Sequence, residues 1–482
     1  MSVGRTALWL VPFALLARGA GFVVPLVIAG WYGVRPETDA FFFALSVPSF
    51  LLVLASNAMG TVAVPHLALL KHREPHRLAS VVAGAAAAAA AVSLSTGAVF
   101  ALALPSVLPR LSSFDAHTAA LAVRHTWLLL PFVGLVAALA VVRAGCEVSG
   151  AFKLASLSPV ARACTNLLAV GLTFGIGPDA LPLGMVLGAL AEFAWLAGVL
   201  HHAGVSPSWP VWPRELGAAA TAVGPVLVGE AMVALNLVVD KGFATALPSG
   251  SVTLLEYADR ARVIPQSLLE SSLLVVAFNT WAAARARGDR EEQRRGVAEA
   301  LRWVFLLAPP VLAGMVIGRE VIIAVLFGHG AFPASGVRPC ADALGASVPG
   351  IFASLVGALL VKAHIIDGRY RLVLALGAGS MLTNAALNVV LAPGFQLVGL
   401  AFSTSITTAL VSLVSWILLR APGESPPRLA RDGLAVLAGS TAFALALLPV
   451  RITDLTDARL WAAALPLVAL LALGARLARR PA

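Results

Sequence analysis

Charged residues are scarce in this chain of 482 residues. Asp, Glu, Lys and Arg together make up 12%, whereas hydrophobic residues reach 59% and the mean hydropathy is +0.90. Soluble globular domains carry about 25% charged residues, so this composition excludes a water-soluble protein. Apolar runs of about 20 residues or more are long enough to cross the hydrocarbon core of a bilayer as helices. Open sheets and barrels fit such runs poorly, and the sequence therefore predicts an all-α polytopic membrane protein.

Cysteine is also rare, and this bears on enzymatic chemistry. The three cysteines, Cys146, Cys164 and Cys340, are far apart and show no metal-ligand spacing. The expected outer loops are short, and the longest, residues 319–338, holds no cluster of metal ligands. A membrane-embedded polymerase or ligase needs a catalytic carboxylate or metal site, so the sequence favours a transporter over an enzyme.

Long apolar segments predict fourteen membrane spans. We expect them at residues 7–30, 39–68, 79–104, 118–143, 154–176, 181–201, 216–246, 252–281, 297–318, 339–363, 370–391, 396–419, 433–450 and 459–477. Residues 1–5 lead straight into the first span with no evident cleavage site, so we expect that span to be retained as an anchor.

Basic residues of the expected loops lie mostly on one side. An even number of spans puts both termini on that side, together with Arg143 and Lys153, whereas Lys241 is assigned to the opposite side. The positive-inside rule then places both termini in the cytoplasm. The net charge of +10 fits a basic face against anionic lipid, and no motif indicates nucleic-acid binding.

The second half of the sequence repeats the first at a nearly constant offset. The matching positions are Gly150 with Gly368, Thr165 with Thr383, Asn166 with Asn384, Pro48 with Pro265, and Gly184 with Gly399. Two copies of one membrane bundle that enclose a central site are a recurrent transporter design. We therefore predict two pseudo-symmetric six-helix lobes, residues 1–204 and 205–422, followed by two extra helices in residues 423–482.

Ionisable residues at membrane depth are costly and indicate function by default. They are Arg18, Arg162, Glu192, Glu230, Asp240, Glu256, Asp259, Arg260, Arg262 and Glu270. The alternative for each is an ion pair or a side chain that reaches the interface. Glu256 and Arg260 are four residues apart and are able to pair on one helix face. Asp39 follows Thr38 at the start of a span, where it could cap its own helix.

Five short motifs occur in order along the chain: LARGAGF at 16–22, TDAFF at 38–42, YADR at 257–260, LFGHGAF at 326–332 and VGLAFSTS at 398–405. Together they resemble the lipid II flippases (the MurJ or MviN family), which share a superfamily with multidrug (MATE) exporters and polysaccharide flippases. The resemblance covers the whole chain and includes the number of spans. It implies a protein of the bacterial inner membrane that acts in peptidoglycan biosynthesis.

The resemblance also implies a function and a set of site residues. Such proteins move an undecaprenyl-pyrophosphate-linked glycan from the inner to the outer leaflet by alternating access, and we expect this chain to act as a monomer among membrane lipids. Arg18, Arg260 and Arg262 are expected to bind the pyrophosphate, because guanidinium makes bidentate contacts to phosphate oxygens. Asp39 is expected to help close the outer gate, and residues 423–482 to form a groove for the lipid tail.

A cation site is implied in part. The matching positions are Asp240, Asn384, Asn388 and Thr404. One carboxylate with neutral oxygens suits sodium, although proton coupling and plain hydrogen bonds between helices stay open as alternatives. Asn388 stands where the family pattern has an aspartate, which lowers the negative charge. No other cofactor or metal is expected.

The sequence departs from the family where arginines are expected. Val24 replaces one of them, and Leu52 and Val53 replace others after Pro48. A less basic cavity leaves three candidates: lipid II, another polyprenyl-linked oligosaccharide of the exopolysaccharide or O-antigen type, or, in a MATE-like exporter, amphiphilic cations. The acidic residues Glu230 and Glu270 keep the MATE-like exporter as an alternative interpretation. Arg162 and Arg262 are candidates to supply the missing positive charge.

Overall fold

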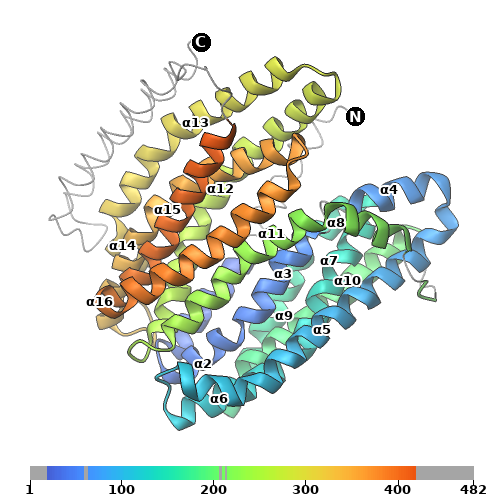
Figure 1. Cartoon of the computed structure of the whole chain (residues 1–482). Coiled ribbons are helices and arrows are strands. Elements are labelled where there is room, and N and C mark those ends of the chain that lie inside the picture. Colours follow the sequence, from blue (N-terminus) through green and yellow to red (C-terminus); the bar gives the residue numbers. More distant parts are fainter. Residues whose placement is uncertain (1–18, 59–62, 206–208, 212–213, 420–482) are drawn as a thin grey trace. The chain divides into compact units, whose positions relative to one another are not determined.

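The computed structural model describes residues 19–58, 63–205, 209–211 and 214–419, and in this part of the chain every regular element is a helix (Figure 1). The expected all-α class is therefore confirmed. The chain forms two compact units, residues 1–253 and 254–482. The predicted lobe boundaries, the pseudo-symmetry between lobes and the count of fourteen spans stay predictions, and residues 423–482 lie outside the described part.

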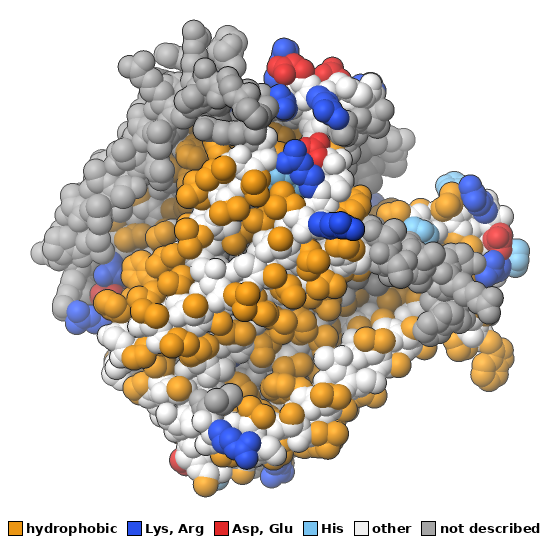
Figure 2. All heavy atoms as spheres, viewed as in Figure 1, with side chains coloured by type: hydrophobic (Ala, Val, Ile, Leu, Met, Phe, Trp, Pro, Cys, Tyr) orange, Lys and Arg blue, Asp and Glu red, His pale blue; other side chains and the backbone are white. Residues whose placement is uncertain are grey.

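Seven helical stretches among the described residues are long and apolar enough to cross a membrane. They are Pro36–Ser56, Pro75–Arg110, Leu130–Val148, Phe174–His202, Arg290–Ile317, Ala334–Ile366 and Tyr370–Leu419. On the face seen in Figure 2, hydrophobic side chains cover much of the surface while most Lys, Arg, Asp and Glu gather near its edges. Val99 in α5 (Leu78–Leu111) and Val390 in α16 (Tyr370–Leu419) are about two-thirds exposed. Such side chains are suited to contact lipid.

The first unit begins with the helical segment Gly19–Tyr32 and ends with the first residues of α12. Its elements are α2 (Pro36–Ala44), α3 (Ser46–Ala58), α4 (Val64–Arg73), η2 (Pro75–Arg77), α5, α6 (Ala116–Leu128), α7 (Leu130–Val148), α8 (Phe152–Ser156), α9 (Ser158–Leu172), η3 (Phe174–Asp179), α10 (Ala180–His202) and α11 (Arg214–Ala244). Val47 and Leu51 of α3 pack against Val133 of α7, with Phe100 of α5 and Val238 of α11 around them. This cluster joins four helices.

Small residues allow α9 and α10 to pack closely. A Cβ atom on Gly184 would lie 3.1 Å from the carbonyl oxygen of Asn166, and one on Gly188 would lie 2.7 Å from that of Arg162. The Gly184-x-x-x-Gly188 pattern therefore serves helix packing. Close packing of backbones is the main way in which helices associate in lipid.

Up to residue 419, where the described part of the chain ends, the second unit contains the rest of α12 (Ser251–Ala286) and four further helices, α13 (Arg290–Ile317), α14 (Arg319–Phe327), α15 (Ala334–Ile366) and α16. Serines of α16 hold α15 at two levels. Ser405 Oγ donates to the carbonyl of Ala346 at 2.8 Å, and Ser412 Oγ donates to that of Ala353 at 2.7 Å. Hydrogen bonds of this type fasten helices together where no water competes.

Equivalent turns occur at the repeated glycines. Gly150 has φ +86° and donates its N–H to Glu147 O, and Gly368 has φ +74° and donates to Ile365 O. In both turns the next residue donates to the carbonyl four positions before the glycine. This is the helix C-terminal motif that favours glycine, because a left-handed φ is costly for other residues. The internal repeat thus has the same local geometry in each unit.

Several predicted segments have a different form in the structure. The span expected at 118–143 is two helices, α6 and α7, because Pro131 lies in the first turn of a new helix. The loop expected at 319–338 contains α14, whose apolar residues follow Gly318. The spans expected at 370–391 and 396–419 both lie in α16, which is interrupted at Gln396 by a left-handed φ of 49°. The last two expected spans lie outside the described residues.

Gly188→Ala should destabilise the first unit by about 1–3 kcal/mol, because the new methyl group would collide with the backbone of α9. The matched control is Gly198→Ala in the same helix, where nothing lies within 4 Å of the added Cβ atom. Thermal unfolding in detergent should give a lower Tm for the first variant and little change for the second. Equal Tm values for the two variants would show that α9 and α10 are not closely packed.

Candidate functional site

Asp39 lies in the first turn of α2 and is 1% exposed. Its Oδ1 accepts hydrogen bonds from Thr253 N at 2.8 Å and Thr253 Oγ1 at 2.6 Å, and its Oδ2 accepts one from Gly250 N. Because α2 begins at Pro36, Asp39 is already inside its own helix. The hypothesis that it caps α2 is therefore wrong, and its carboxylate caps the N-terminus of α12.

The capping contact has charge as well as hydrogen bonds. Unsatisfied N–H groups give a helix N-terminus partial positive charge, which attracts a carboxylate. Lys241, fully buried in α11, interacts electrostatically with Asp39 and donates from Nζ to Val252 O at 3.5 Å. The sequence assigned Lys241 only to the basic residues of the outer side. The structure makes it part of the group that fixes the start of α12.

Arg260 lies two turns into α12 and forms the ion pair expected from the sequence. Its Nε lies 2.6 Å from Glu256 Oε1, and the arginine side chain is 39% exposed whereas that of the glutamate is 8% exposed. The carboxylate thus holds one edge of the guanidinium group while the rest of the group stays accessible. The other N–H donors of the guanidinium group point away from that edge.

Arg262 belongs to a row of polar side chains on the same helix. Its Nη2 lies 3.2 Å from Asp259 Oδ1, and its Nη1 donates to Gln266 Oε1 at 3.4 Å. Gln266 Nε2 in turn donates to Glu270 Oε1 at 2.9 Å. Spacings of three and four residues place these groups on one face of α12. The helix therefore presents an extended polar stripe that contains Arg262.

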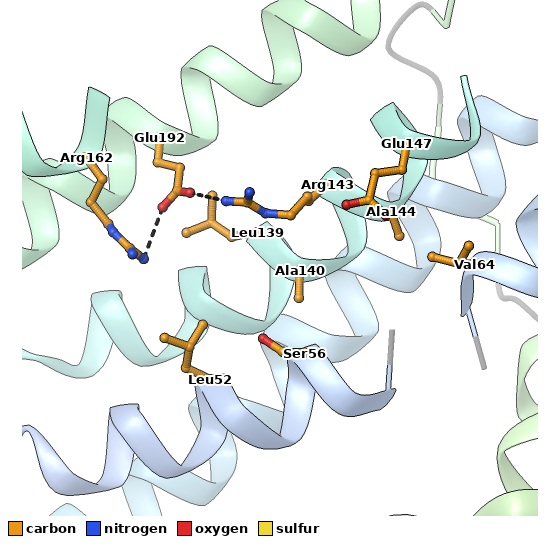
Figure 3. A pocket seen from close by; sticks show the side chains of 10 residues that line it. All are labelled: Leu52, Ser56, Val64, Leu139, Ala140, Arg143, Ala144, Glu147, Arg162 and Glu192. Atoms are coloured by element: carbon orange, nitrogen blue, oxygen red, sulfur yellow. Dashed lines mark hydrogen bonds and ion pairs between the residues drawn. The ribbon is translucent and has the colours of Figure 1, made fainter. Parts of the chain in front are cut away.

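A pocket in the first unit contains a second group of charges (Figure 3). Glu192 of α10 is 1% exposed, and its Oε1 accepts hydrogen bonds from Arg143 Nη2 at 2.5 Å and from Ser158 Oγ at 2.9 Å. Arg162 Nη1 lies 3.2 Å from the other carboxylate oxygen, Oε2. One buried carboxylate thus joins arginines from α7 and α9. Leu52 and Ser56 of α3 form the facing wall.

The residues predicted to bind a cation fall in different parts of the chain. Asn384, Asn388 and Thr404 lie in α16, and the two asparagines are fully buried. Thr404 Oγ1 lies 3.4 Å from Asn384 Oδ1 and 3.3 Å from Leu400 O. Asp240 lies in α11, which belongs to the first unit. The structure thus brings together the side-chain oxygens of Asn384 and Thr404, while the full ligand set stays a prediction.

Sequence reasoning missed parts of these groups. Arg143 was assigned to a basic loop, although it lies within α7 and contacts Glu192. Thr253 and Lys241 received no role. The available signal was a basic residue at the edge of a long apolar segment, which is equally typical of an interfacial charge. Arg18 lies outside the described residues.

Comparison with known proteins decides the family. The family model described as "Lipid II flippase MurJ" matches residues 28–462. The chain belongs to the MurJ family. It is 25% identical to the lipid II flippase MurJ of Burkholderia cenocepacia over 453 residues. The aligned region covers 89% of this chain and 86% of the relative. Members of this family are transporters, so the expectation of a multi-pass bacterial inner-membrane transporter is confirmed.

Solved structures agree on the fold. A lipid II flippase MurJ in an inward closed conformation is similar with a TM-score of 0.80, at 18% identity over 98% of each chain. An inward-facing multidrug resistance MATE family transporter of the MOP superfamily has a TM-score of 0.66, at 15% identity over 89% of this chain and 95% of its own. The MurJ fold and the likeness of this fold to that of the MATE transporters, both expected from the sequence motifs, are therefore confirmed.

Asp39→Ala should loosen the start of α12, because the amides of Gly250 and Thr253 lose their acceptor. A lost cap costs about 1–2 kcal/mol, so hydrogen exchange at these two amides should accelerate about tenfold. Asp115→Ala is the matched control, since Asp115 caps α6 by accepting from Thr118 N at 3.0 Å. It should accelerate exchange at Thr118 and leave residues 250–253 unchanged. Unchanged exchange at 250–253 in Asp39→Ala would contradict the capping role.

Proposed function

We propose that this chain carries lipid II, an undecaprenyl-pyrophosphate-linked peptidoglycan precursor, from the inner to the outer leaflet by alternating access. The observation that carries this proposal is the family match over residues 28–462, supported by a relative that covers 89% of the chain and is named a lipid II flippase. The activity is transport, so the chain needs sites that bind and release a ligand and no group that reacts with it. Its role is in cell-wall biogenesis.

We infer the finer architecture from the sequence. It consists of fourteen spans in two six-helix lobes, with both termini in the cytoplasm, and residues 423–482 supply a groove for the polyprenyl tail. The membrane stretches among the described residues and the matching turns at Gly150 and Gly368 support it. The protein works as a monomer that contacts membrane lipids and the lipid-linked glycan.

Asp39 is the gate residue of this proposal. Its carboxylate joins the start of the α2–α3 stretch to the first turn of α12 through backbone amides. A contact of this kind is made or broken as a unit when α12 moves. The buried Lys241 beside it favours the charged carboxylate and hence the closed arrangement.

Arg18, Arg260 and Arg262 are the proposed ligands of the pyrophosphate. Arg260 supports this role, because Glu256 holds only one edge of its guanidinium group. A phosphate oxygen pair is then able to take the remaining donors in a bidentate contact. Arg262, paired with Asp259, lies two residues further along the same helix and points to a different side of it.

A second candidate substrate is another polyprenyl-linked oligosaccharide. The observation in its favour is the absence of arginine at Val24, Leu52 and Val53, which lowers the positive charge available for the head group. A MATE-like exporter of amphiphilic cations is the third candidate. Glu270 is held by Gln266, and acidic groups of this kind suit a cationic ligand. The family match favours the lipid-linked glycans over it.

Complementation tests the function. In a bacterium depleted of its own lipid II flippase, this chain should restore growth. Asp39→Ala and Arg260→Ala should fail to do so at equal expression, because they remove the gate contact and a head-group ligand. Arg287→Ala is the control and should restore growth, since Arg287 is 59% exposed and pairs with Glu292. If the unchanged chain is well expressed but does not restore growth, the proposed substrate becomes another polyprenyl-linked glycan.

We also propose sodium as the coupling ion, bound by Asp240, Asn384, Asn388 and Thr404, with a proton as the alternative. Sodium should then stabilise the protein by about 2.7 kcal/mol at roughly 100 times its Kd, seen as a rise in Tm over choline chloride. Asp240→Asn should abolish the rise, and Asn388→Asp should enlarge it by adding a carboxylate. A sodium effect that survives Asp240→Asn would exclude this ligand set.

A further inference from the structure

The pocket of the first unit is lined by two arginines, Arg143 and Arg162, and two glutamates, Glu147 and Glu192. Glu192 is 1% exposed, whereas the side chains of Arg143 and Arg162 are 30% and 26% exposed. The Glu192 carboxylate is therefore held between the two guanidinium groups, which are its more accessible partners. Glu147 lies on the opposite side of Arg143 from Glu192 (Figure 3).

The two arginines keep donors available for a ligand. Arg143 uses Nη2 for Glu192 and Ser158, and Nη1 makes a long contact of 3.4 Å with Ala155 O. Arg162 uses Nη1 for Glu192. A guanidinium group carries five N–H donors in a fixed fork. Because the carboxylate fixes both forks at one edge, the remaining donors are oriented before a ligand arrives, which lowers the entropy cost of binding.

Size limits what the pocket can accept. Its volume is about 200 Å³. Pockets for drug-sized ligands measure about 300–1,000 Å³, so this pocket fits a small group and not a whole glycan. Leu52 and Ala140 give the pocket apolar walls beside the arginines. A low-dielectric wall strengthens the attraction between guanidinium and an anion.

The geometry points to a binding subsite for the diphosphate group of the lipid-linked substrate, made by Arg143 and Arg162 and oriented by Glu192. This inference rests on the proposed function. In the orientation predicted from the loop charges, the ends of α3 and α7 and the start of α9 face the cytoplasm. The subsite therefore opens toward the leaflet in which the substrate is made. Arg143 and Arg162 supply there the positive charge that Leu52 of the same pocket lacks.

Arg162→Gln is the main test variant. Glu192 keeps Arg143 and Ser158 as partners in this variant, so no buried carboxylate is left unpaired and the protein should fold. The affinity for undecaprenyl diphosphate, measured by titration in phosphatidylcholine nanodiscs, should fall about tenfold, the effect of losing one charge-assisted contact. Arg124→Gln is the control and should bind within twofold of the unchanged protein, since Arg124 is 65% exposed and pairs with Asp179.

Parallel titrations identify the source of the phosphate. Inorganic pyrophosphate should also bind Arg162→Gln more weakly than the unchanged protein, because it has the same diphosphate group, whereas phosphatidylglycerol should bind the two proteins equally. An equal loss for phosphatidylglycerol would show a site for bulk anionic lipid, and a loss for pyrophosphate alone would show a site for soluble phosphate. Either result, or unchanged affinity for undecaprenyl diphosphate, would overturn the inference.

Two further variants separate a binding role from a folding role. The triple variant Arg143→Gln, Glu192→Gln, Arg162→Gln removes all three charges together and should keep its Tm while losing diphosphate affinity by more than tenfold. If its affinity instead equals that of the unchanged protein, the three residues are structural only. If the unchanged chain restores growth but Arg162→Gln binds undecaprenyl diphosphate with unchanged affinity, the subsite is wrong and the proposed function stands. If Arg162→Gln binds the diphosphate more weakly but the unchanged chain does not restore growth, the subsite stands and the proposed substrate is wrong.

Discussion

A charged group at membrane depth must find its partner within the protein, and this constraint determines how the polar groups of the structure are arranged. Water is absent there, so an unpaired ion costs several kcal/mol. Glu192 is nearly inaccessible and has three partners from two other helices. Asp39 is equally buried and is bound by backbone amides and a hydroxyl group of one turn. In each case the buried ion ties together segments that are far apart in the sequence.

The same constraint explains why acidic and basic groups differ in exposure. Glu256 and Glu192 are more buried than the arginines that they hold. A carboxylate accepts several bonds at short range, whereas the long arginine side chain leaves part of its fork outside the pair. In these two groups the arginines are the accessible partners and the glutamates are the buried ones. An accessible guanidinium group of this kind suits a ligand that carries phosphate.

Much of the fold could be predicted from the sequence, because helix length and hydropathy are local properties. The turns at Gly150 and Gly368 were predictable from glycine, and the Glu256–Arg260 pair from its spacing of four residues. The break in α16 at Gln396 could not be predicted, since this residue adopts a left-handed φ without being glycine. The partners of Asp39 and Glu192 were also beyond the sequence, because tertiary contacts between distant helices leave no local pattern. Arg143 illustrates this: its position suggested an interfacial charge, and only its partner reveals a pocket.

The cap on α12 has a consequence for how the chain tolerates change over evolution. Two of the three bonds to Asp39 come from the main-chain nitrogens of residues 250 and 253. Every amino acid except proline supplies that nitrogen, although residue 250 has a φ of +93°, which favours glycine, and Thr253 adds its hydroxyl group to the contact. The rest of the turn is thus free to change as sequences diverge, provided that Gly250, its conformation and the single aspartate persist. A contact made by peptide groups is therefore conserved more easily than the side chains of the residues that carry those groups.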